Sequence, residues 1–171
     1  MSRGKQFHEC LQRHFKGESV DETEIIPEVR EIWKSIEPLL SNFQTPGVLI
    51  EERLSHPYLH YKGVVDCVSF HNSVLSVIEW KKSDRHKKTV TSTFDAPIQL
   101  CSYVGALNAS RPEFLQKPIK SGVIVVAYND GSKADLFEIK ENELKRYWKV
   151  WLNRLQEYWV RYKDNTLPSE I

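Results

Sequence analysis

The chain has 171 residues, 40% of them hydrophobic, and its 24 basic and 23 acidic side chains give a formal net charge of +1. It has no apolar stretch long enough to cross a bilayer, which excludes an integral membrane protein, and its length suits one α/β domain at 1–163 with a tail at 164–171. The near-neutral charge gives little support for nucleic-acid binding, so the distribution of charge matters more.

The first predicted element is an amphipathic helix that starts near Gly4. Phe7, Leu11 and Phe15 recur at helical spacing. Gly4 and His8 lie one turn apart on one face, and His8 could supply a nitrogen ligand to a divalent metal. A lone histidine at such a position is more often a capping or surface residue. No hydrophobic run opens the chain, so neither a signal peptide nor an intact transit peptide is visible.

Two scaffold segments are predicted before the centre of the chain. Apolar residues at helical spacing predict a helix over 25–40, with Pro27 near its start and Pro38 kinking or ending it. Residues 47–54 are predicted to form a strand with two successive glutamates. The first of them, Glu51, is a candidate to face a functional site, although an edge-strand carboxylate is usually just solvated.

The central feature is an antiparallel hairpin predicted from two runs rich in β-branched residues, 64–70 and 74–81. Because side chains alternate along a strand, Glu79 and Lys81 are expected to project from the same face. With Asp66 on the partner strand, they form two carboxylates and a lysine around one point. Carboxylates bind Mg²⁺ or Mn²⁺, and the lysine can act as a base or hold an attacking hydroxide. The alternative is an ordinary charged pair on a solvated strand.

A run of cations follows this hairpin directly. Lys82, Arg85, Lys87 and Lys88 lie between the second strand and a Thr/Ser-rich stretch at 89–93. Such a loop can follow a phosphate backbone into a site. For any one of these side chains, a solvated turn is an equally good interpretation.

The segment that begins at Asp95 is predicted to be a helix. Asp95 is a suitable N-cap residue and Pro97 suits the first turn. Gln99 and Tyr103 are then four residues apart on one helical face. An amide and a phenol would thus point toward whatever the hairpin holds, where they could contact a phosphate.

The remaining elements are predicted as scaffold. Residues 122–128 form a nearly continuous apolar run typical of a buried strand, and a turn leads to another strand near 136–139. The last helix, from about 141 to 163, carries an aromatic stripe that could stack the bases of single-stranded DNA. Packing in the core is the favoured interpretation, with Tyr158 and Tyr162 as the exposed members.

The three cysteines, Cys10, Cys67 and Cys101, show no metal-ligand spacing. They are expected to be small core residues in a reducing compartment. Three scattered thiols argue against an iron–sulfur cluster, which needs four cysteine ligands.

The ordered motifs G-x-x-x-H, G-x-x-D, E-x-K and Q-x-x-x-Y resemble the PD-(D/E)xK nuclease superfamily, in its RecB-like branch, and most of all its mitochondrial exonucleases. The resemblance runs from Gly4 to about Tyr158. It implies a restriction-endonuclease-like α/β fold, in which helices flank a central mixed sheet, and hydrolysis of DNA phosphodiester bonds.

The resemblance also implies a divalent-metal site, with Mg²⁺ as the cofactor and Mn²⁺ able to substitute. The metal would be held by a histidine, two acids and a backbone carbonyl, beside a catalytic lysine and two residues that support the scissile phosphate. In this chain these are His8, Asp66, Glu79, the carbonyl of Trp80, Lys81, Gln99 and Tyr103.

By the same resemblance, the chain is expected to act in mitochondria as an exonuclease on single-stranded DNA or flaps, in mitochondrial DNA replication and maintenance. We expect a monomer without a membrane partner. Residue spacing alone does not distinguish an exonuclease from an endonuclease. Two alternatives therefore stay open: a duplex endonuclease of the superfamily, and a noncatalytic DNA-binding module of the same fold.

Overall fold

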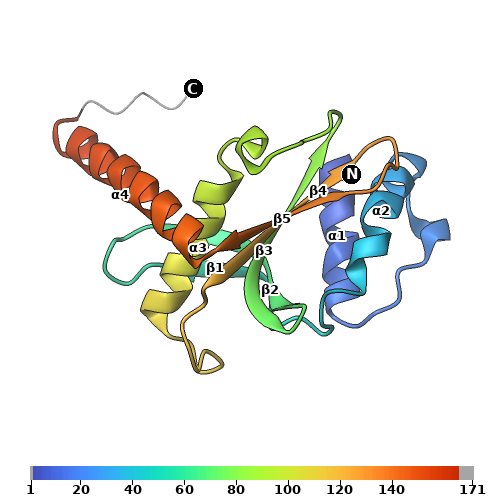
Figure 1. The fold of residues 1–171 in the computed structure, drawn as a ribbon, viewed down its shortest axis with the longest axis horizontal. Helices are drawn as coiled ribbons and strands as arrows, with labels where there is room; N and C mark the ends of the chain where they lie inside the picture. The colour runs from blue at the N-terminus through green and yellow to red at the C-terminus, as the bar shows by residue number, and fades with distance from the viewer. Residues whose placement is uncertain (1, 166–171) are drawn as a thin grey trace.

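The computed structural model describes residues 2–165, which form a five-stranded mixed sheet between two layers of helices (Figure 1). The strands, in sheet order, are β1 (Leu49–Ser55), β2 (Lys62–His71), β3 (Val74–Ser83), β4 (Ser121–Tyr128) and β5 (Asp135–Lys140). The helices are α1 (Arg3–Phe15), α2 (Pro27–Leu40), α3 (Ala96–Ser110) and α4 (Glu141–Lys163), with short 3₁₀ helices η1 (Glu22–Glu24) and η2 (Val90–Thr93). The predicted α/β class with a central mixed sheet is confirmed.

Neighbouring strands are antiparallel except for β3 and β4, which are parallel. Parallel strands need a long crossover, and here η2 and α3 provide it. The hairpin between β2 and β3 turns through Asn72 and Ser73, whose φ angles are 45° and 67°. Two successive positive φ angles are typical of the two-residue turn whose twist matches a hairpin. The two predicted runs of the hairpin are therefore paired as expected.

Each face of the sheet has its own hydrophobic core. α1 and α2 cover one face, and α3 and the start of α4 cover the other (Figure 1). Along β3, Ile78 and Trp80 pack into the α1–α2 core, whereas Val77 packs into the α3–α4 core. This alternation confirms that Glu79 and Lys81 lie on the α3 side of the sheet.

Two local features differ from, or refine, the sequence interpretation. α2 continues through Pro38 and ends two residues later at Leu40. The side chain of Asp95 makes no capping hydrogen bond to α3 and instead accepts one from Arg154. Because Asp95 has helical backbone angles, it does not have the extended conformation that an N-cap side chain needs to reach back to the helix.

The aromatic stripe of α4 is split between core and solvent. Leu144 and Leu155 are buried, and Tyr158 and Tyr162 are exposed as predicted; Trp159 is exposed as well.

Cys10, Cys67 and Cys101 are buried free thiols. Among the described residues, no helix combines the length and apolarity that a membrane crossing requires. Of the predicted tail, residues 166–171 lie outside the described part of the chain.

The close approach of α3 and α4 depends on Gly105. A Cβ atom at this position would lie 2.2 Å from Cζ3 of Trp148. We therefore expect Gly105→Ala to lower the free energy of unfolding by about 1–3 kcal/mol, the usual cost of overpacking. Urea denaturation followed by tryptophan fluorescence measures this change.

Gly4→Ala is the matched control, because a Cβ there would meet only Lys82 Cε, at an ordinary 3.5 Å. Alanine is the better helix former, so this variant should be as stable as the parent or more stable by up to about 1 kcal/mol. Equal stability of the Gly105 and Gly4 variants would contradict the packing argument.

Candidate active site

The site begins where the β2–β3 ladder stops. The last ladder pair is Cys67 and Ile78, and Asp66 lies just beyond it. There, Asp66 Oδ2 accepts the backbone N–H of Trp80 at 2.9 Å. The carboxylate thus occupies the space between two separating strands, and it lies close to groups from both helical layers.

Glu51 lies across from Asp66 on the neighbouring strand. The ladder pairs Ile50 with Cys67 and Glu52 with Val65, so Glu51 and Asp66 are the two residues between these pairs. Glu51 has a φ of 47°, a left-handed conformation that is uncommon for a glutamate. β1 continues through Glu51, but its pairing with β2 skips this residue. The Glu51 side chain is half-buried beside Asp66 and His8.

His8 completes this cluster from α1. Its Nδ1 lies 3.3 Å from Glu51 Oε1 and 3.8 Å from Asp66 Oδ1. The three residues each offer one ligand atom, and these atoms all lie within 4.8 Å of one another. Burial and the charge of Asp66 raise the pKa of Glu51, partly offset by His8. Carboxylates this close together repel each other unless a cation lies between them. The cluster is therefore suited to binding a cation.

Glu79 is the most buried acid of the site. Its side chain is 2% exposed, and its Oε2 lies 3.3 Å from Lys81 Nζ. Burial, with a further contribution from the charge of Asp66, raises the pKa of Glu79 to about 8, although Lys81 opposes the shift. Its other oxygen, Oε1, is buried without a hydrogen-bond partner among the described residues. A buried, unsatisfied carboxylate oxygen is costly unless a ligand binds it.

A chain of polar contacts leads from Lys81 to α3. Lys81 Nζ donates to Gln99 Oε1 at 2.9 Å, and Gln99 Nε2 donates to the Tyr103 hydroxyl at 3.0 Å. Burial and the charge of Glu79 raise the pKa of Tyr103, so the phenol stays a neutral donor. Gly63 makes room for this ring, because a Cβ there would lie 2.6 Å from Tyr103 Cε1. The predicted helical amide and phenol are therefore brought to the hairpin.

The donor set fits a hard divalent cation. It consists of carboxylate oxygens with one imidazole nitrogen, which suits Mg²⁺ and accepts Mn²⁺. The family resemblance implies His8, Asp66, Glu79 and the Trp80 carbonyl as ligands. The cluster includes His8 and Asp66 but not Glu79, and metal binding by all four stays a prediction. Glu51, the secondary candidate, is one of the three members of the cluster. Its position depends on strand register, which no local sequence motif encodes.

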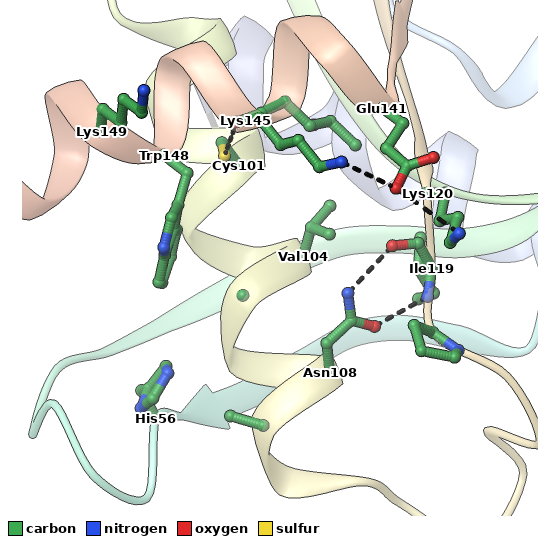
Figure 2. A pocket seen from close by; sticks show the side chains of 14 residues that line it. His56, Cys101, Val104, Asn108, Ile119, Lys120, Glu141, Lys145, Trp148 and Lys149 are labelled. Carbon is green, nitrogen blue, oxygen red and sulfur yellow. Dashed lines mark hydrogen bonds and ion pairs between the residues drawn. The ribbon is translucent and has the colours of Figure 1, made fainter.

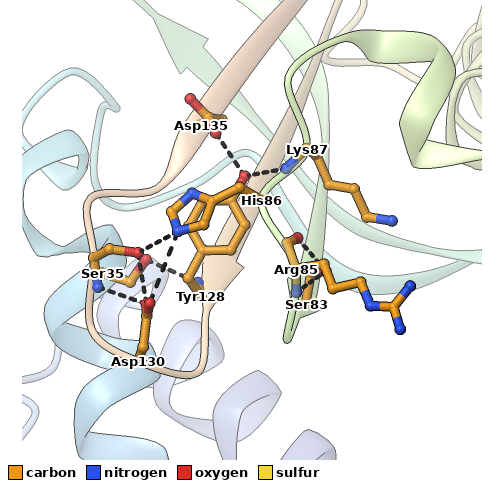
Figure 3. Close-up of polar contacts among 9 residues, drawn as sticks. Ser35, Ser83, Arg85, His86, Lys87, Tyr128, Asp130 and Asp135 are labelled. Atoms are coloured by element: carbon orange, nitrogen blue, oxygen red, sulfur yellow. Dashed lines mark hydrogen bonds and ion pairs between the residues drawn. The ribbon is translucent and has the colours of Figure 1, made fainter.

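The basic loop after β3 is fixed by Tyr128 of β4 (Figure 3). The Tyr128 hydroxyl accepts the backbone N–H of Lys87 at 2.8 Å and donates to Asp135 at 2.5 Å, and the His86 ring packs on the tyrosine. Burial raises the pKa of Tyr128 to about 12, so it remains a donor. Arg85 and Lys88 are exposed on this loop, and Lys82 is exposed near the end of β3. Contact of these cations with DNA stays a prediction.

A separate cavity of about 620 Å³ lies between α3 and α4 (Figure 2). None of the predicted site residues lines it. Its polar groups mostly satisfy one another: Asn108 bonds both backbone groups of Ile119, and Glu141 lies within 3.5 Å of Lys120 and 3.2 Å of Lys145. It therefore lacks the converging acids that phosphodiester chemistry uses.

Comparison with known proteins finds curated relatives that share one name. The chain is 35% identical over 168 residues to mitochondrial genome maintenance exonuclease 1 of Mus musculus and 32% identical over 175 residues to that of Homo sapiens, each match covering 98% of this chain and 48% of the relative. The Xenopus tropicalis protein of the same name is 35% identical over 164 residues, 92% of this chain and 44% of that protein. The chain thus spans about half the length of these curated relatives. No protein-family model matches it.

The cluster of His8, Glu51 and Asp66 predicts different roles for two adjacent glutamates. Glu51→Gln should weaken Mn²⁺ binding at least about tenfold, because it removes one of the clustered carboxylate charges. Glu52→Gln is the matched control, since Glu52 is exposed and pairs with Val65 in the regular part of the ladder. Isothermal titration calorimetry with Mn²⁺ in the absence of DNA measures both affinities. Equal losses in the two variants would remove Glu51 from the ligand set.

The raised pKa of Glu79 predicts a pH-dependent stability in the metal-free protein. An unfolded glutamate releases its proton near its ordinary pKa of 4.5, whereas folded Glu79 keeps it to about pH 8. The folded state therefore binds more protons within this range, and stability falls as pH rises from about 4.5 to about 8.

Glu79→Gln should remove this dependence. In the presence of a chelator we expect its Tm to exceed that of the parent by roughly 5 °C at pH 8 and to be close to it at pH 4.5. Glu113→Gln, at an exposed position, serves as the control and should leave the pH profile unchanged. A parent protein equally stable at both pH values would refute the assignment.

Proposed function

Because the chain is homologous to the mitochondrial genome maintenance exonucleases over about half their length, we propose that it is a metal-dependent DNA exonuclease. The single observation that carries this proposal is the convergence of His8, Glu51 and Asp66 at the open end of the β2–β3 hairpin. The second strand of this hairpin, β3, carries Lys81. The reaction is hydrolysis of phosphodiester bonds in single-stranded DNA or flaps, in mitochondrial DNA replication and maintenance.

Mg²⁺ is the proposed cofactor, with Mn²⁺ as a substitute. His8, Glu51 and Asp66 would hold it, with Glu79 and the Trp80 carbonyl as further proposed ligands. When bound, such an ion polarises a phosphate oxygen and lowers the pKa of a bound water. The buried Glu79 Oε1, which lacks a hydrogen-bond partner in the described structure, supports a cation beside it.

Lys81 is the proposed catalytic residue. Glu79 and Gln99 hold its ammonium group in place through contacts of 3.3 and 2.9 Å. From this position it can orient the attacking water and offset the negative charge that develops on the phosphate. Because two partners fix the long side chain before substrate arrives, little rotamer entropy is lost on binding.

Gln99 and Tyr103 are the proposed phosphate contacts. The Gln99 amide joins the lysine to the phenol, so the three groups present donors from one continuous chain. The neutral Tyr103 hydroxyl can donate to a phosphate oxygen without adding negative charge. The cations Lys82, Arg85, Lys87 and Lys88 would guide the strand toward these groups.

The relatives' names support a mitochondrial location. A monomer is proposed as the simplest active form.

The removal of Lys81 tests the proposal. We expect Lys81→Ala to lower the cleavage rate by about 10³-fold or more, because the residue acts on the reacting groups. DNA affinity should stay close to that of the parent. Lys133→Ala, at an exposed lysine outside the site, is the matched control and should cleave normally.

Three labelled substrates with Mg²⁺ or Mn²⁺ define the activity: a linear single strand, a circular single strand and a blunt duplex. Cleavage of only the linear strand is expected. Cleavage of the circle or of the interior of the duplex would indicate an endonuclease. DNA binding without cleavage of any substrate would indicate a noncatalytic DNA-binding module.

A further inference from the structure

A cavity of about 400 Å³ adjoins the candidate site on the α3 side. Gln99 and Tyr103, which connect to Lys81, form part of its wall. The rest comes from Asp95 and from further residues of α3, from Tyr61 and Lys62 where β2 begins, and from the middle of α4. Its volume falls within the range of small-ligand pockets and is sufficient for one nucleotide. Asp95 and Trp151 also line it; the sequence singles them out only as a helix N-cap and as part of the aromatic stripe of the last helix.

One side of this cavity is a fixed aromatic wall. The Tyr61 hydroxyl donates to the carbonyl of Ser102 on α3 at 2.7 Å, which locks the ring in place. Trp151 of α4 packs edge-to-face on Tyr61, with ring centroids 5.0 Å apart. Trp151 is only partly buried and lines the cavity, so part of the indole is accessible. A rigid indole is a surface on which an unpaired nucleobase or a sugar can pack.

Two cations, Lys62 and Arg154, also line the cavity. Arg154 Nη1 donates to Asp95 at 3.0 Å, in a pair whose side chains are 49% and 74% exposed. Ion pairs this exposed are weak, so a phosphate can compete with Asp95 for the guanidinium. A planar guanidinium with several N–H donors is well suited to bind a phosphate oxygen pair.

We infer that this cavity binds one nucleotide of a single-stranded polynucleotide, adjacent to the nucleotide whose phosphate lies at the metal site. Arg154 and Lys62 contact its phosphate, and Trp151 contacts its base or sugar. The inference rests on the proposed function and gives the preference for single strands a physical origin. A base that packs on Trp151 must leave its stack and its complementary partner, which a duplex resists.

The test is equilibrium binding of a fluorescein-labelled dT₁₀ oligonucleotide in EDTA, measured by anisotropy at several salt concentrations. Arg154→Gln should raise Kd about tenfold and lower the slope of log K against log salt by about 0.7, the value for one lost phosphate contact on a single strand. Arg146→Gln, at another exposed arginine of α4, should change Kd by less than about twofold. Arg154→Lys, which keeps the charge, should recover part of the affinity.

Removal of Arg154 also leaves Asp95 unopposed, so the carboxylate must be controlled. Asp95→Asn alone should bind dT₁₀ more tightly than the parent, because it removes a competitor for the guanidinium. It should leave α3 intact, since Asp95 makes no capping hydrogen bond. In the Asp95→Asn background, Arg154→Gln should still weaken binding and lower the salt slope. If the second substitution has no effect there, Arg154 does not contact phosphate and the inference is overturned.

Trp151→Leu tests the aromatic wall and should weaken binding of dT₁₀ about tenfold. Its affinity for an oligonucleotide made only of abasic sites should match that of the parent, provided the contact is with the base. A loss on both ligands identifies the sugar as the contact, which also supports the subsite. Unchanged binding by Trp151→Leu would overturn the aromatic contact, just as unchanged binding by the Arg154 variant would overturn the phosphate contact.

Cleavage assays on the same proteins separate this inference from the proposed function. If the parent binds dT₁₀ through Arg154 but cleaves no DNA with Mg²⁺ or Mn²⁺, the subsite is supported and the exonuclease proposal fails. If the parent cleaves DNA and Arg154→Gln binds and cleaves like the parent, the exonuclease proposal stands and the subsite is overturned. A parent that does not bind dT₁₀ at all also overturns the subsite.

Discussion

The hydrogen bond from the Trp80 backbone to Asp66 is the interaction on which the candidate site depends. It forms where β2 and β3 stop pairing, and it replaces a strand-to-strand contact with a side chain that also lies near His8. Without this separation, the hairpin would continue and Asp66 would follow the regular alternation of β2. The opening brings a group held by the sheet close to groups from both helical layers.

The same opening has an energetic cost. Three acids, Glu51, Asp66 and Glu79, lie close enough to raise the pKa values of Glu51 and Glu79, and burial contributes the larger part of each shift. Lys81 and His8 offset this repulsion only partly. Carboxylates in such an unfavourable environment favour the binding of a cation. A bound cation would reduce the repulsion between them and would give the unsatisfied oxygen a partner.

Around this acidic centre, the side chains of the helices and of the basic loop are held in place with different firmness. The Lys81, Gln99 and Tyr103 chain is rigid and tied to α3, whereas Arg154 is held by an exposed pair that a phosphate can replace. The loop after β3 is fixed through its backbone to Tyr128, which leaves the Arg85 side chain exposed. In the proposed nuclease, this division would separate groups that orient the reaction from groups that bind the charged strand.

The sequence by itself determined the element types, the hairpin, and the shared face of Glu79 and Lys81, because these follow from local periodicity. It also placed Gln99 and Tyr103 on one helical face. It could not show that Glu51 lies across from Asp66, that Asp95 binds Arg154 rather than capping α3, or that Trp151 and Arg154 border the site. Only the tertiary structure decided these points, since they depend on strand register and helix packing between segments far apart in the chain, which no local pattern encodes.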